Sequence, residues 1–432
     1  MVYFSTNNTN EIATLKEAVI RGLAPDKGLY MPSAINAFNA DFIENISNYS
    51  FQEIAFETAK LFFGEDVPTD NLRDLVFEAV NFEAPVVDLD DSLSVLELWH
   101  GPTLAFKDFG ARFMARMLGY FLKNQDKEVH VLVATSGDTG SAVANGFLGV
   151  EGIKVHILYP KGKVSEFQEK QMTTLGQNIS ALEVDGVFDD CQEMVKKAFL
   201  DKELNQRLYL TSANSINIAR LFPQSFYYGN AVAQKINEEK PLTFCVPSGN
   251  FGNLTSGIFA KRMGMPIHHF IAATNRNNVV PEYINTGAFV PRESVQTISN
   301  AMDVGNPSNF ARMKSVYGGS HAEMANDISA FYFNDDQTKE AVREIYQRYN
   351  YVMDPHGAVA YLAAKEYIQD HKEERVILLE TAHPAKFAKV VEEAIEEPIE
   401  IPKAQRACLE KEKKSTPITN RFDELKSYLF DL

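Results

Sequence analysis

The sequence predicts an α/β protein in which parallel β-sheets are covered by helices on both faces, preceded by a separate, mostly helical N-terminal region. Two observations lead to this fold class. Apolar runs of strand length alternate with helical segments from about residue 90 onward. The first ninety or so residues contain amphipathic helices instead. No segment repeats at a fixed period, so a repeat architecture is not indicated.

The N-terminal region begins with helical spacing at 15–23, and 24–32 follows as a turn with a short extended piece. Residues 43–63 and 69–83 have the apolar periodicity of amphipathic helices. We therefore expect residues 1–92 to form an N-terminal domain.

Strands and helices alternate in the rest of the chain. The predicted strands are 94–99, 129–136, 154–160, 179–186, 242–248, 268–275 and 375–381. The predicted helices are 109–124, 141–148, 165–176, 189–200 and 249–264. The strongly polar stretch at 403–415 is interpreted as a solvated surface segment.

Length and composition limit the classes of protein. A chain of 432 residues suggests two or three domains, and 45% hydrophobic with 23% charged residues is typical of globular proteins. The net charge of −16 argues against non-specific nucleic-acid binding, which needs clustered Lys and Arg. An anionic ligand would need a local pocket of donors.

The cysteines and the N-terminus suggest a compartment. Cys191, Cys245 and Cys408 are odd in number and far apart, which favours reduced cytosolic thiols over a disulfide framework or a zinc site. The first 16 residues lack the basic head and apolar run of a signal peptide. No stretch approaches the ~20 apolar residues of a membrane helix. We expect a soluble, cytoplasmic protein without a metal site.

Two glycine-rich segments, 133–142 and 246–257, each leave a predicted strand and open a helix. Such loops present backbone N–H groups to an anion at a helix N-terminus. Neither has the order of a P-loop or the G-x-G-x-x-G spacing of a dinucleotide site. The phosphate carriers that remain are mononucleotides, sugars and pyridoxal phosphate (PLP).

Lys107 lies among Leu104, Phe106 and Phe109. Desolvation in apolar surroundings disfavours the charged amine, so its pKa would fall, and a neutral amine can form a Schiff base with an aldehyde. PLP carries both an aldehyde and a phosphate. The alternative is a surface lysine whose stem packs on apolar side chains while its ammonium reaches water.

Several motifs together resemble the threonine synthase family of PLP enzymes. They are GLAPDKGLYMP, HGPTLAFKDFGARF, ATSGDTGSA, SGNFGN, SNAMDVGNPSNFAR (299–312) and ETAHPAKF (380–387), which are spread over nearly the whole chain. The resemblance implies the two-lobed fold type II of PLP enzymes, which is similar to the tryptophan synthase β-subunit, with an extra N-terminal domain. The smaller lobe would comprise roughly 105–225 and the larger lobe 93–104 with 226–390, which makes 93–390 the catalytic region and 391–432 a C-terminal segment.

The resemblance also implies the roles of cofactor-binding residues. Lys107 would hold PLP as a Schiff base and then act as the acid and base. The loop residues Gly249, Asn250, Phe251, Gly252 and Asn253 would bind the cofactor phosphate, largely through backbone N–H groups. Thr381 would offer its hydroxyl to the pyridine nitrogen, although without the resemblance its position favours a cap on the turn before Pro384.

The implied substrate, O-phospho-L-homoserine, needs sites for a carboxylate and a phosphate. Its expected ligands are Ser136, Asp138 and Thr139 at one loop, Asn214 and Arg220, and Lys163. An aspartate at 138 would repel an anionic cofactor oxygen unless one of the two is protonated. His100 and His356 are either supporting groups near the site or buried structural histidines.

The implied activity is that of a carbon–oxygen lyase, which makes L-threonine and phosphate by γ-elimination and β-replacement in the last step of threonine biosynthesis. The enzyme would be a monomer or homodimer that binds neither nucleic acid nor membranes. The alternative within PLP enzymes is another fold type II enzyme, a serine/threonine dehydratase or an O-acetylserine-type synthase. Outside them, a non-catalytic relative or a nucleotide-binding α/β enzyme remains open.

Overall fold

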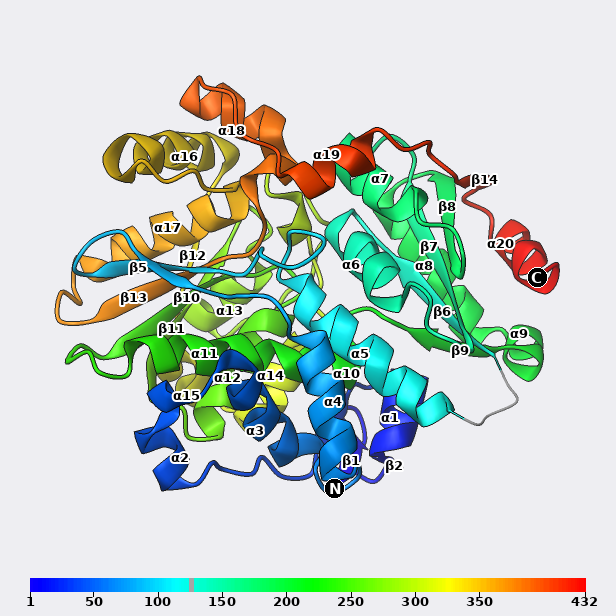
Figure 1. The fold of residues 1–432 in the computed structure, drawn as a ribbon, viewed down its shortest axis with the longest axis horizontal. Coiled ribbons are helices and arrows are strands. Elements are labelled where there is room, and N and C mark those ends of the chain that lie inside the picture. Colours follow the sequence, from blue (N-terminus) through cyan, green and yellow to red (C-terminus); the bar gives the residue numbers. More distant parts are fainter. Residues whose placement is uncertain (124–127) are drawn as a thin grey trace.

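The computed structural model describes residues 1–123 and 128–432. Two large sheets, each with helices on both faces, lie side by side, and the N-terminal region lies at the bottom of the view (Figure 1). All strand pairs in these two sheets are parallel except one at an edge. The predicted α/β fold with parallel sheets between helices is therefore confirmed.

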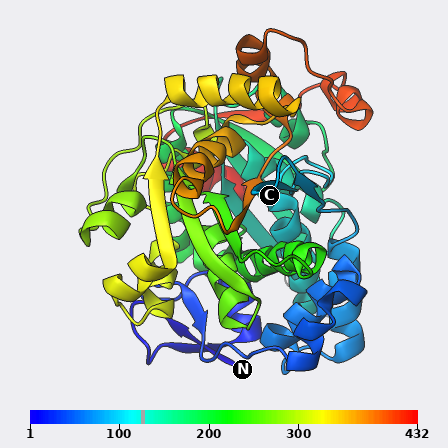
Figure 2. The same cartoon turned by 90° about the vertical axis from the view of Figure 1, so that its left-hand side faces the viewer.

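The larger sheet has six strands in the order β12-β11-β10-β13-β5-β4, and only β4 is antiparallel to its neighbour (Figure 2). Alternate residues of its strands enter different cores: Phe244 joins the core on one face, and Cys245 joins the core on the other. The strands are β4 (Val86–Asp88), β5 (Leu93–Glu97), β10 (Leu242–Pro247), β11 (Ile267–Thr274), β12 (Ile328–Tyr332) and β13 (Arg375–Glu380).

Helices cover both faces of this sheet. One face packs against α16 (Asp335–Tyr349), α17 (Pro355–Ile368) and α18 (Ala388–Ile395). The other packs against α11 (Ser225–Lys235), α12 (Gly252–Arg262) and α13 (Val279–Thr286). Shorter elements complete this lobe: η3 (Asn300–Met302), α14 (Phe310–Val316), α15 (His321–Asp327) and η4 (Pro384–Phe387).

The smaller sheet is wholly parallel, in the order β14-β8-β7-β6-β9. Its strands are β6 (Val129–Ala134), β7 (Ile153–Pro160), β8 (Ile179–Asp185), β9 (Tyr209–Ser212) and β14 (Thr416–Thr419). Its helices are α5 (Lys107–Leu122), α6 (Asp138–Phe147), α7 (Glu166–Thr173), α8 (Phe188–Leu200), α9 (Lys202–Arg207) and α10 (Ile218–Leu221), with η2 (Phe222–Gln224) after them. The helix predicted at 109–124 corresponds to α5. Residue 124, the last residue of the prediction, lies outside the described residues.

The N-terminal region combines helices with a small antiparallel sheet in the order β2-β1-β3. Its elements are β1 (Val2–Ser5), β2 (Ile12–Thr14), α1 (Leu15–Arg21), β3 (Tyr30–Pro32), α2 (Ala40–Glu44), η1 (Ile46–Asn48), α3 (Phe51–Phe63) and α4 (Thr69–Ala79). The prediction of one helix over 43–63 is wrong. Ser50 starts a new helix there, because its side chain accepts the N–H of Glu53 and the Glu53 side chain accepts the N–H of Ser50.

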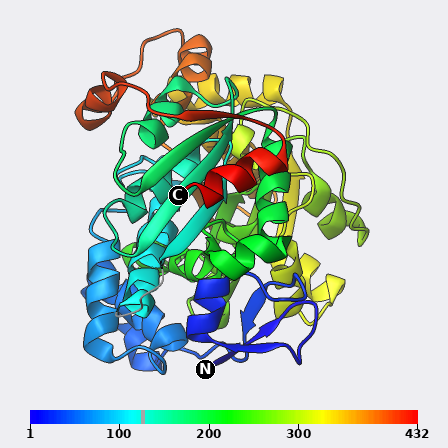
Figure 3. The same cartoon turned by 90° about the vertical axis from the view of Figure 1, so that its right-hand side faces the viewer.

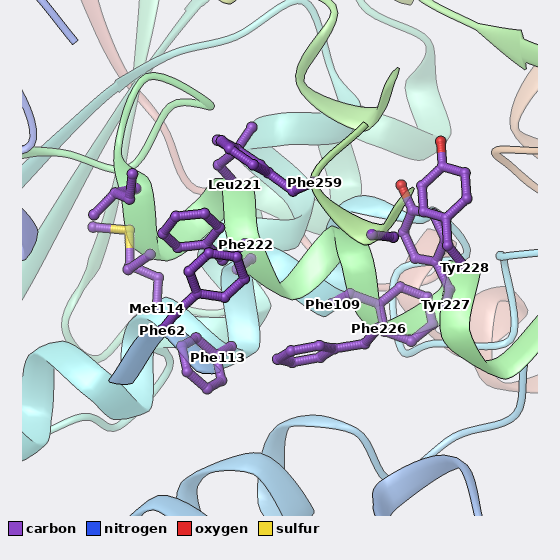
Figure 4. Close-up of a cluster of buried hydrophobic side chains, with 14 of the residues drawn as sticks. Phe62, Phe109, Phe113, Met114, Leu221, Phe222, Phe226, Tyr227, Tyr228 and Phe259 are labelled. Atoms are coloured by element: carbon purple, nitrogen blue, oxygen red, sulfur yellow. The ribbon is translucent and has the colours of Figure 1, made fainter. Parts of the chain in front are cut away.

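An aromatic cluster joins this region to the rest of the molecule (Figure 4). Phe62 of α3 stacks on Phe222 with ring centroids 3.7 Å apart. Phe109 of α5 contacts Phe82 at 4.6 Å and Tyr227 at 5.5 Å. All of these rings except Phe82 are fully buried or nearly so. The helix that begins with Lys107 is thus fixed from both sides by apolar packing.

The C-terminal segment contains more structure than predicted. The polar stretch 403–415 is mostly exposed, as expected, and its first part forms α19 (Lys403–Leu409). Beyond it, β14 adds an edge strand to the smaller sheet, and α20 (Phe422–Phe430) packs against α8 over the same sheet (Figure 3). Lys413 pairs with Glu169 and Glu183, each at 2.7 Å. Among the described residues, no helix combines the length and apolar character needed to cross a membrane.

Candidate active site

The candidate residues lie in loops at the carboxyl ends of strands from both sheets. Lys107 follows β5, Asp138 follows β6, the 248–252 loop follows β10, and Thr381 follows β13. Ligand sites of α/β proteins form at this edge of a sheet. Side-chain contacts between the loops of the two sheets join the lobes here.

Lys107 is the first residue of α5, and its Nζ lies 3.7 Å from Asp138 Oδ2 and 4.9 Å from the centre of the Phe106 ring. Its side chain is 17% exposed. Burial lowers the pKa of Lys107, and the carboxylate of Asp138 opposes that shift. Lys107 is therefore a mostly buried amine and not a surface lysine.

Asp138 is the first residue of α6 and accepts hydrogen bonds on Oδ1 from Lys386 Nζ at 2.7 Å and Gln168 Nε2 at 3.0 Å. Burial opposes the charged form, but the ammonium groups of Lys386 and Lys107 hold the pKa of Asp138 below its usual range. Sequence reasoning did not identify Lys386 or Gln168. Lys386 lay within a recognised motif, yet nothing in the sequence indicated which residue it contacts.

The loop between β10 and α12 has the geometry of an anion site. Phe251 caps α12 with a left-handed φ of 60°, so the chain turns sharply into the helix. Within the described residues, no backbone acceptor takes the N–H groups of Gly249, Asn250 or Gly252. The positive end of the α12 dipole adds to these donors. An anion can therefore bind there through several N–H groups.

Side chains of the loop fix its shape instead of filling the site. Asn253 donates to the carbonyl of Pro247 at 2.8 Å and accepts from Ser248 Oγ at 2.6 Å. Asn250 donates to Ser215 Oγ at 2.7 Å and accepts the N–H of Ser308. Two segments far apart in the sequence thus hold the loop in place.

Thr381 directly follows β13, and its carbonyl accepts the N–H of Phe106 at 2.9 Å. This bond ties the end of the larger sheet to the residue before Lys107. Within the described residues, the Thr381 hydroxyl has no protein partner at hydrogen-bond distance, so it is free to contact a ligand.

The proposed substrate ligands occupy different environments. Arg220 is buried, donates through Nη1 to the carbonyl of Ala213, and has an Nε without a partner among the described residues. Burial lowers the pKa of Arg220 to about 10. Asn214 donates to the carbonyl of Ala134 at 3.2 Å. Lys163 is exposed, and no contact in the described part of the chain joins it to the other candidates.

Ser136 and Thr139 are partly exposed and flank the start of α6. Between them, Gly137 has a φ of 140°, which favours glycine, and its N–H donates to Thr135 Oγ1 at 2.9 Å. The N–H of Gly140 donates to the same hydroxyl at 2.9 Å. This second loop therefore has a defined shape next to Asp138.

The residues present fit PLP. The buried amine of Lys107 suits its aldehyde, and the N–H groups that precede α12 suit its phosphate. A Cβ added at Gly252 would lie 3.4 Å from Asn309 Nδ2 and 3.6 Å from Gln224 Nε2, so two side-chain amides lie close to the start of α12.

Family models match almost the full length of the chain. The model for the pyridoxal-phosphate dependent enzymes matches residues 85–381, that for the threonine synthase N terminus matches 2–80, and that for the threonine synthase C-terminal part matches 357–429. The threonine synthase of Serratia marcescens is 42% identical over 433 residues, which cover 100% of both chains. The chain belongs to the threonine synthase family.

Solved structures of threonine synthases agree with this assignment. The crystal structure of the Escherichia coli enzyme has a TM-score of 0.93 at 40% identity and covers 100% of both chains. The PLP-bound threonine synthase from Brucella melitensis has a TM-score of 0.92 at 34% identity and covers 99% of this chain and 98% of its own. The chain is accordingly a PLP-dependent carbon–oxygen lyase that converts O-phospho-L-homoserine and water to L-threonine and phosphate.

The two histidines considered in the sequence occupy supporting positions in this threonine synthase fold. His100 contacts Glu97 Oε2 at 2.8 Å and stacks on Trp99. His356 is buried, and its Nε2 accepts the N–H of Ala301 at 3.2 Å. The His356 Nδ1 proton therefore points to Asp354, the contact on its other side.

Proposed function

We propose that the threonine synthase reaction takes place where the loops of the two sheets meet, with Lys107 as the residue that holds PLP and moves the substrate's protons. The observation that carries this proposal is the mostly buried Nζ of Lys107, 3.7 Å from Asp138 Oδ2. An amine whose pKa is lowered by burial is both a nucleophile towards an aldehyde and a base near neutral pH.

Five consecutive residues bind the cofactor phosphate in this proposal, mainly through backbone N–H groups at the start of α12. They are Gly249, Asn250, Phe251, Gly252 and Asn253. Thr381 contacts the pyridine nitrogen through its hydroxyl, and a neutral partner there does not require a protonated ring. When bound, PLP withdraws electrons from the substrate carbon next to its amino group.

The substrate lies between the two lobes. Ser136 and Thr139, at the start of α6, bind its carboxylate, and Asp138 faces its amino group. Asn214, Arg220 and Lys163 bind its phosphate. Arg220 is suited to this role, because no carboxylate lies within ion-pair distance of it in the described part of the chain and its Nε lacks a partner there.

Lys107 accounts for the proton transfers. Its free amine takes the proton from Cα, and loss of a second proton from Cβ lets phosphate leave from Cγ. A proton then adds at Cγ in place of the one lost from Cβ. Water supplies the hydroxyl group at Cβ and its second proton goes to the released phosphate, while Lys107 returns a proton to Cα. The atoms balance as O-phospho-L-homoserine plus water giving L-threonine plus phosphate.

The test uses Lys107→Ala in the full-length chain. We expect it to lose the visible absorbance of bound PLP and all phosphate release from O-phospho-L-homoserine. Lys235→Ala is the matched control, because Lys235 is also a largely buried lysine but pairs with Asp88 and Glu238 at the amino end of β5. Absorbance and turnover that survive in Lys107→Ala would contradict the proposal.

The domain boundaries, the cellular compartment and the oligomeric state are also part of this proposal. We assign residues 1–92 to an N-terminal domain, 93–390 to the catalytic region and 391–432 to a C-terminal segment. We further infer a cytoplasmic monomer or homodimer that does not bind nucleic acid. The net charge of −16 and the free thiols of Cys191, Cys245 and Cys408 support this setting.

A further inference from the structure

A second lysine lies in the candidate active site. The Lys386 side chain is fully buried, and its Nζ donates to Asp138 Oδ1 at 2.7 Å and to the carbonyl of Thr103 at 2.9 Å. Lys386 belongs to η4, five residues after Thr381, and therefore reaches Asp138 from the larger lobe.

Asp138 lies between two amines. Its Oδ1 accepts from Lys386, and its Oδ2 faces Lys107 Nζ at 3.7 Å. Gln168 donates to Oδ1 from α7 at 3.0 Å, so a neutral amide completes the set. This arrangement puts two potential cations on one carboxylate that is itself only 4% exposed.

Other charged groups face this cluster. Arg220 from α10 and Asp354 at the start of α17 act on Lys107 with opposite signs. Asp108 from α5 and the ring of His383 lie near Lys386. Within the described residues, none of these four groups forms an ion pair with either lysine, whereas Asp138 contacts both.

We propose that Lys386 is a positioning residue that compensates the charge of Asp138 and so limits how strongly Asp138 holds a proton on the nitrogen of Lys107. The inference rests on the proposed role of Lys107. It would also allow Asp138 to stand beside an anionic cofactor oxygen, because the ammonium of Lys386 would neutralise the carboxylate and no protonated carboxyl group would be needed.

The charges define the direction of the effect. Without Lys386, Asp138 faces Lys107 alone, and the repulsion between the two ammonium groups is lost as well. Both changes favour the protonated nitrogen of Lys107. Removing the charge of Asp138 has the opposite effect on the same nitrogen.

The experiment is a pH titration of the visible absorbance of PLP bound to the full-length holoenzyme, which does not depend on turnover. We expect the midpoint to rise by about one unit or more in Lys386→Met and Lys386→Gln, because a close opposite charge shifts a pKa by about 1–3 units. The midpoint falls in Asp138→Asn. In the double variant Lys386→Met/Asp138→Asn it returns towards the wild-type value.

The controls separate this effect from general damage. Lys386→Gln retains N–H donors for Thr103 and Asp138, so it provides a charge-free variant if Lys386→Met does not fold. Lys235→Met removes a largely buried, ion-paired lysine far from the loops of the site and leaves the midpoint unchanged. Titration curves of both Lys386 variants identical to that of the wild type overturn the proposal. A wild-type protein without PLP absorbance overturns the role of Lys107 instead.

Discussion

The backbone N–H of Asp354 donates to Glu380 Oε1 at 2.7 Å, and both carboxyl groups are fully buried. Asp354 Oδ2 and Glu380 Oε2 have no partner among the described residues. Burial, together with the negative charge of Asp354, raises the pKa of Glu380 well above its usual value. Burial therefore favours the protonated form of the Glu380 carboxyl group, directly before Thr381.

Glu380→Gln tests this protonation through the pH dependence of stability. Because the pKa of Glu380 is higher in the folded than in the unfolded chain, the folded state binds more protons, and stability is lost as pH rises above the usual value of 4.5. Glutamine has no proton to lose. We compare the free energy of unfolding of Glu380→Gln with that of the wild type. The difference should change in favour of the variant by about 1.4 kcal/mol for each pH unit above 4.5, until the pH reaches the pKa of Glu380 in the folded protein.

Urea unfolding at several pH values measures this gain. Glu340→Gln is the control, because Glu340 is exposed on α16 and its substitution leaves the pH profile of the wild type unchanged. If Glu380→Gln also follows the wild-type profile, Glu380 is ionised in the folded protein.

Gly249→Ala tests the shape of the phosphate loop. A Cβ at this position would lie 2.7 Å from Met302 Cα and 2.8 Å from the carbonyl oxygen of Ala301, which are backbone atoms that cannot rotate away. The loop must therefore move, and a displacement of about 1 Å lowers turnover about 100-fold. Cofactor affinity, measured by absorbance titration, falls with it.

Gly119→Ala provides the matched glycine. Its Cβ would lie 3.2 Å from Val150 Cγ1, a side-chain atom that can move. Alanine also has a higher helix propensity than glycine in the interior of α5. This variant retains normal cofactor affinity. Equal affinity in both variants would show that the contact of Gly249 with 301–302 does not shape the site.

Arg312→Met tests a buried connection between three parts of the chain. The fully buried guanidinium of Arg312 donates to the carbonyls of Tyr30, Ser215 and Ile216, and to Asn309 Oδ1. Methionine leaves these acceptors without donors. Each acceptor that receives no hydrogen bond from water costs about 1–3 kcal/mol of stability. We expect the variant to lose at least about 3 kcal/mol in urea unfolding.

An exposed arginine serves as the comparison for Arg312. Arg73→Met removes an exposed guanidinium that lies over the rings of Phe56 and Phe77, and its effect stays at about 1 kcal/mol, the size of an exposed cation–π contact. A loss of similar size in Arg312→Met would mean that water replaces its hydrogen bonds.

The predicted strands agree closely with the observed ones where the strand is buried on both faces. The prediction for 129–136 matches β6 (Val129–Ala134), because such strands are continuous apolar runs. The edge strand β14, with the sequence TPIT, has one buried residue and was not predicted. Edge strands expose one side of the ladder to water, so their composition does not distinguish them from loops.

The candidate site was predictable only where its signal is local in the sequence. Lys107 and the 249–253 loop were identified because the contiguous motifs that contain them resemble those of a known family, and their residue types alone left other interpretations open. Lys386 and Gln168 matter because each contacts Asp138 across the fold, and no local pattern encodes that contact. The same holds for Ser215, which meets Asn250 from a different lobe.

His156→Gln tests a buried histidine pair in the smaller sheet. The rings of His130 and His156 are parallel within 9°, and His130 Nδ1 lies 3.1 Å from His156 Nε2. Burial lowers the pKa of His156 to about 3, so the unfolded chain binds a proton below pH 6.5 that the folded chain does not, and stability falls as pH falls from 6.5 towards 3. Removing His156 makes this loss shallower by up to about 1.4 kcal/mol per pH unit, as urea unfolding across that range will measure. An unchanged slope in His156→Gln would mean that His156 binds its proton as readily in the folded protein as in the unfolded chain.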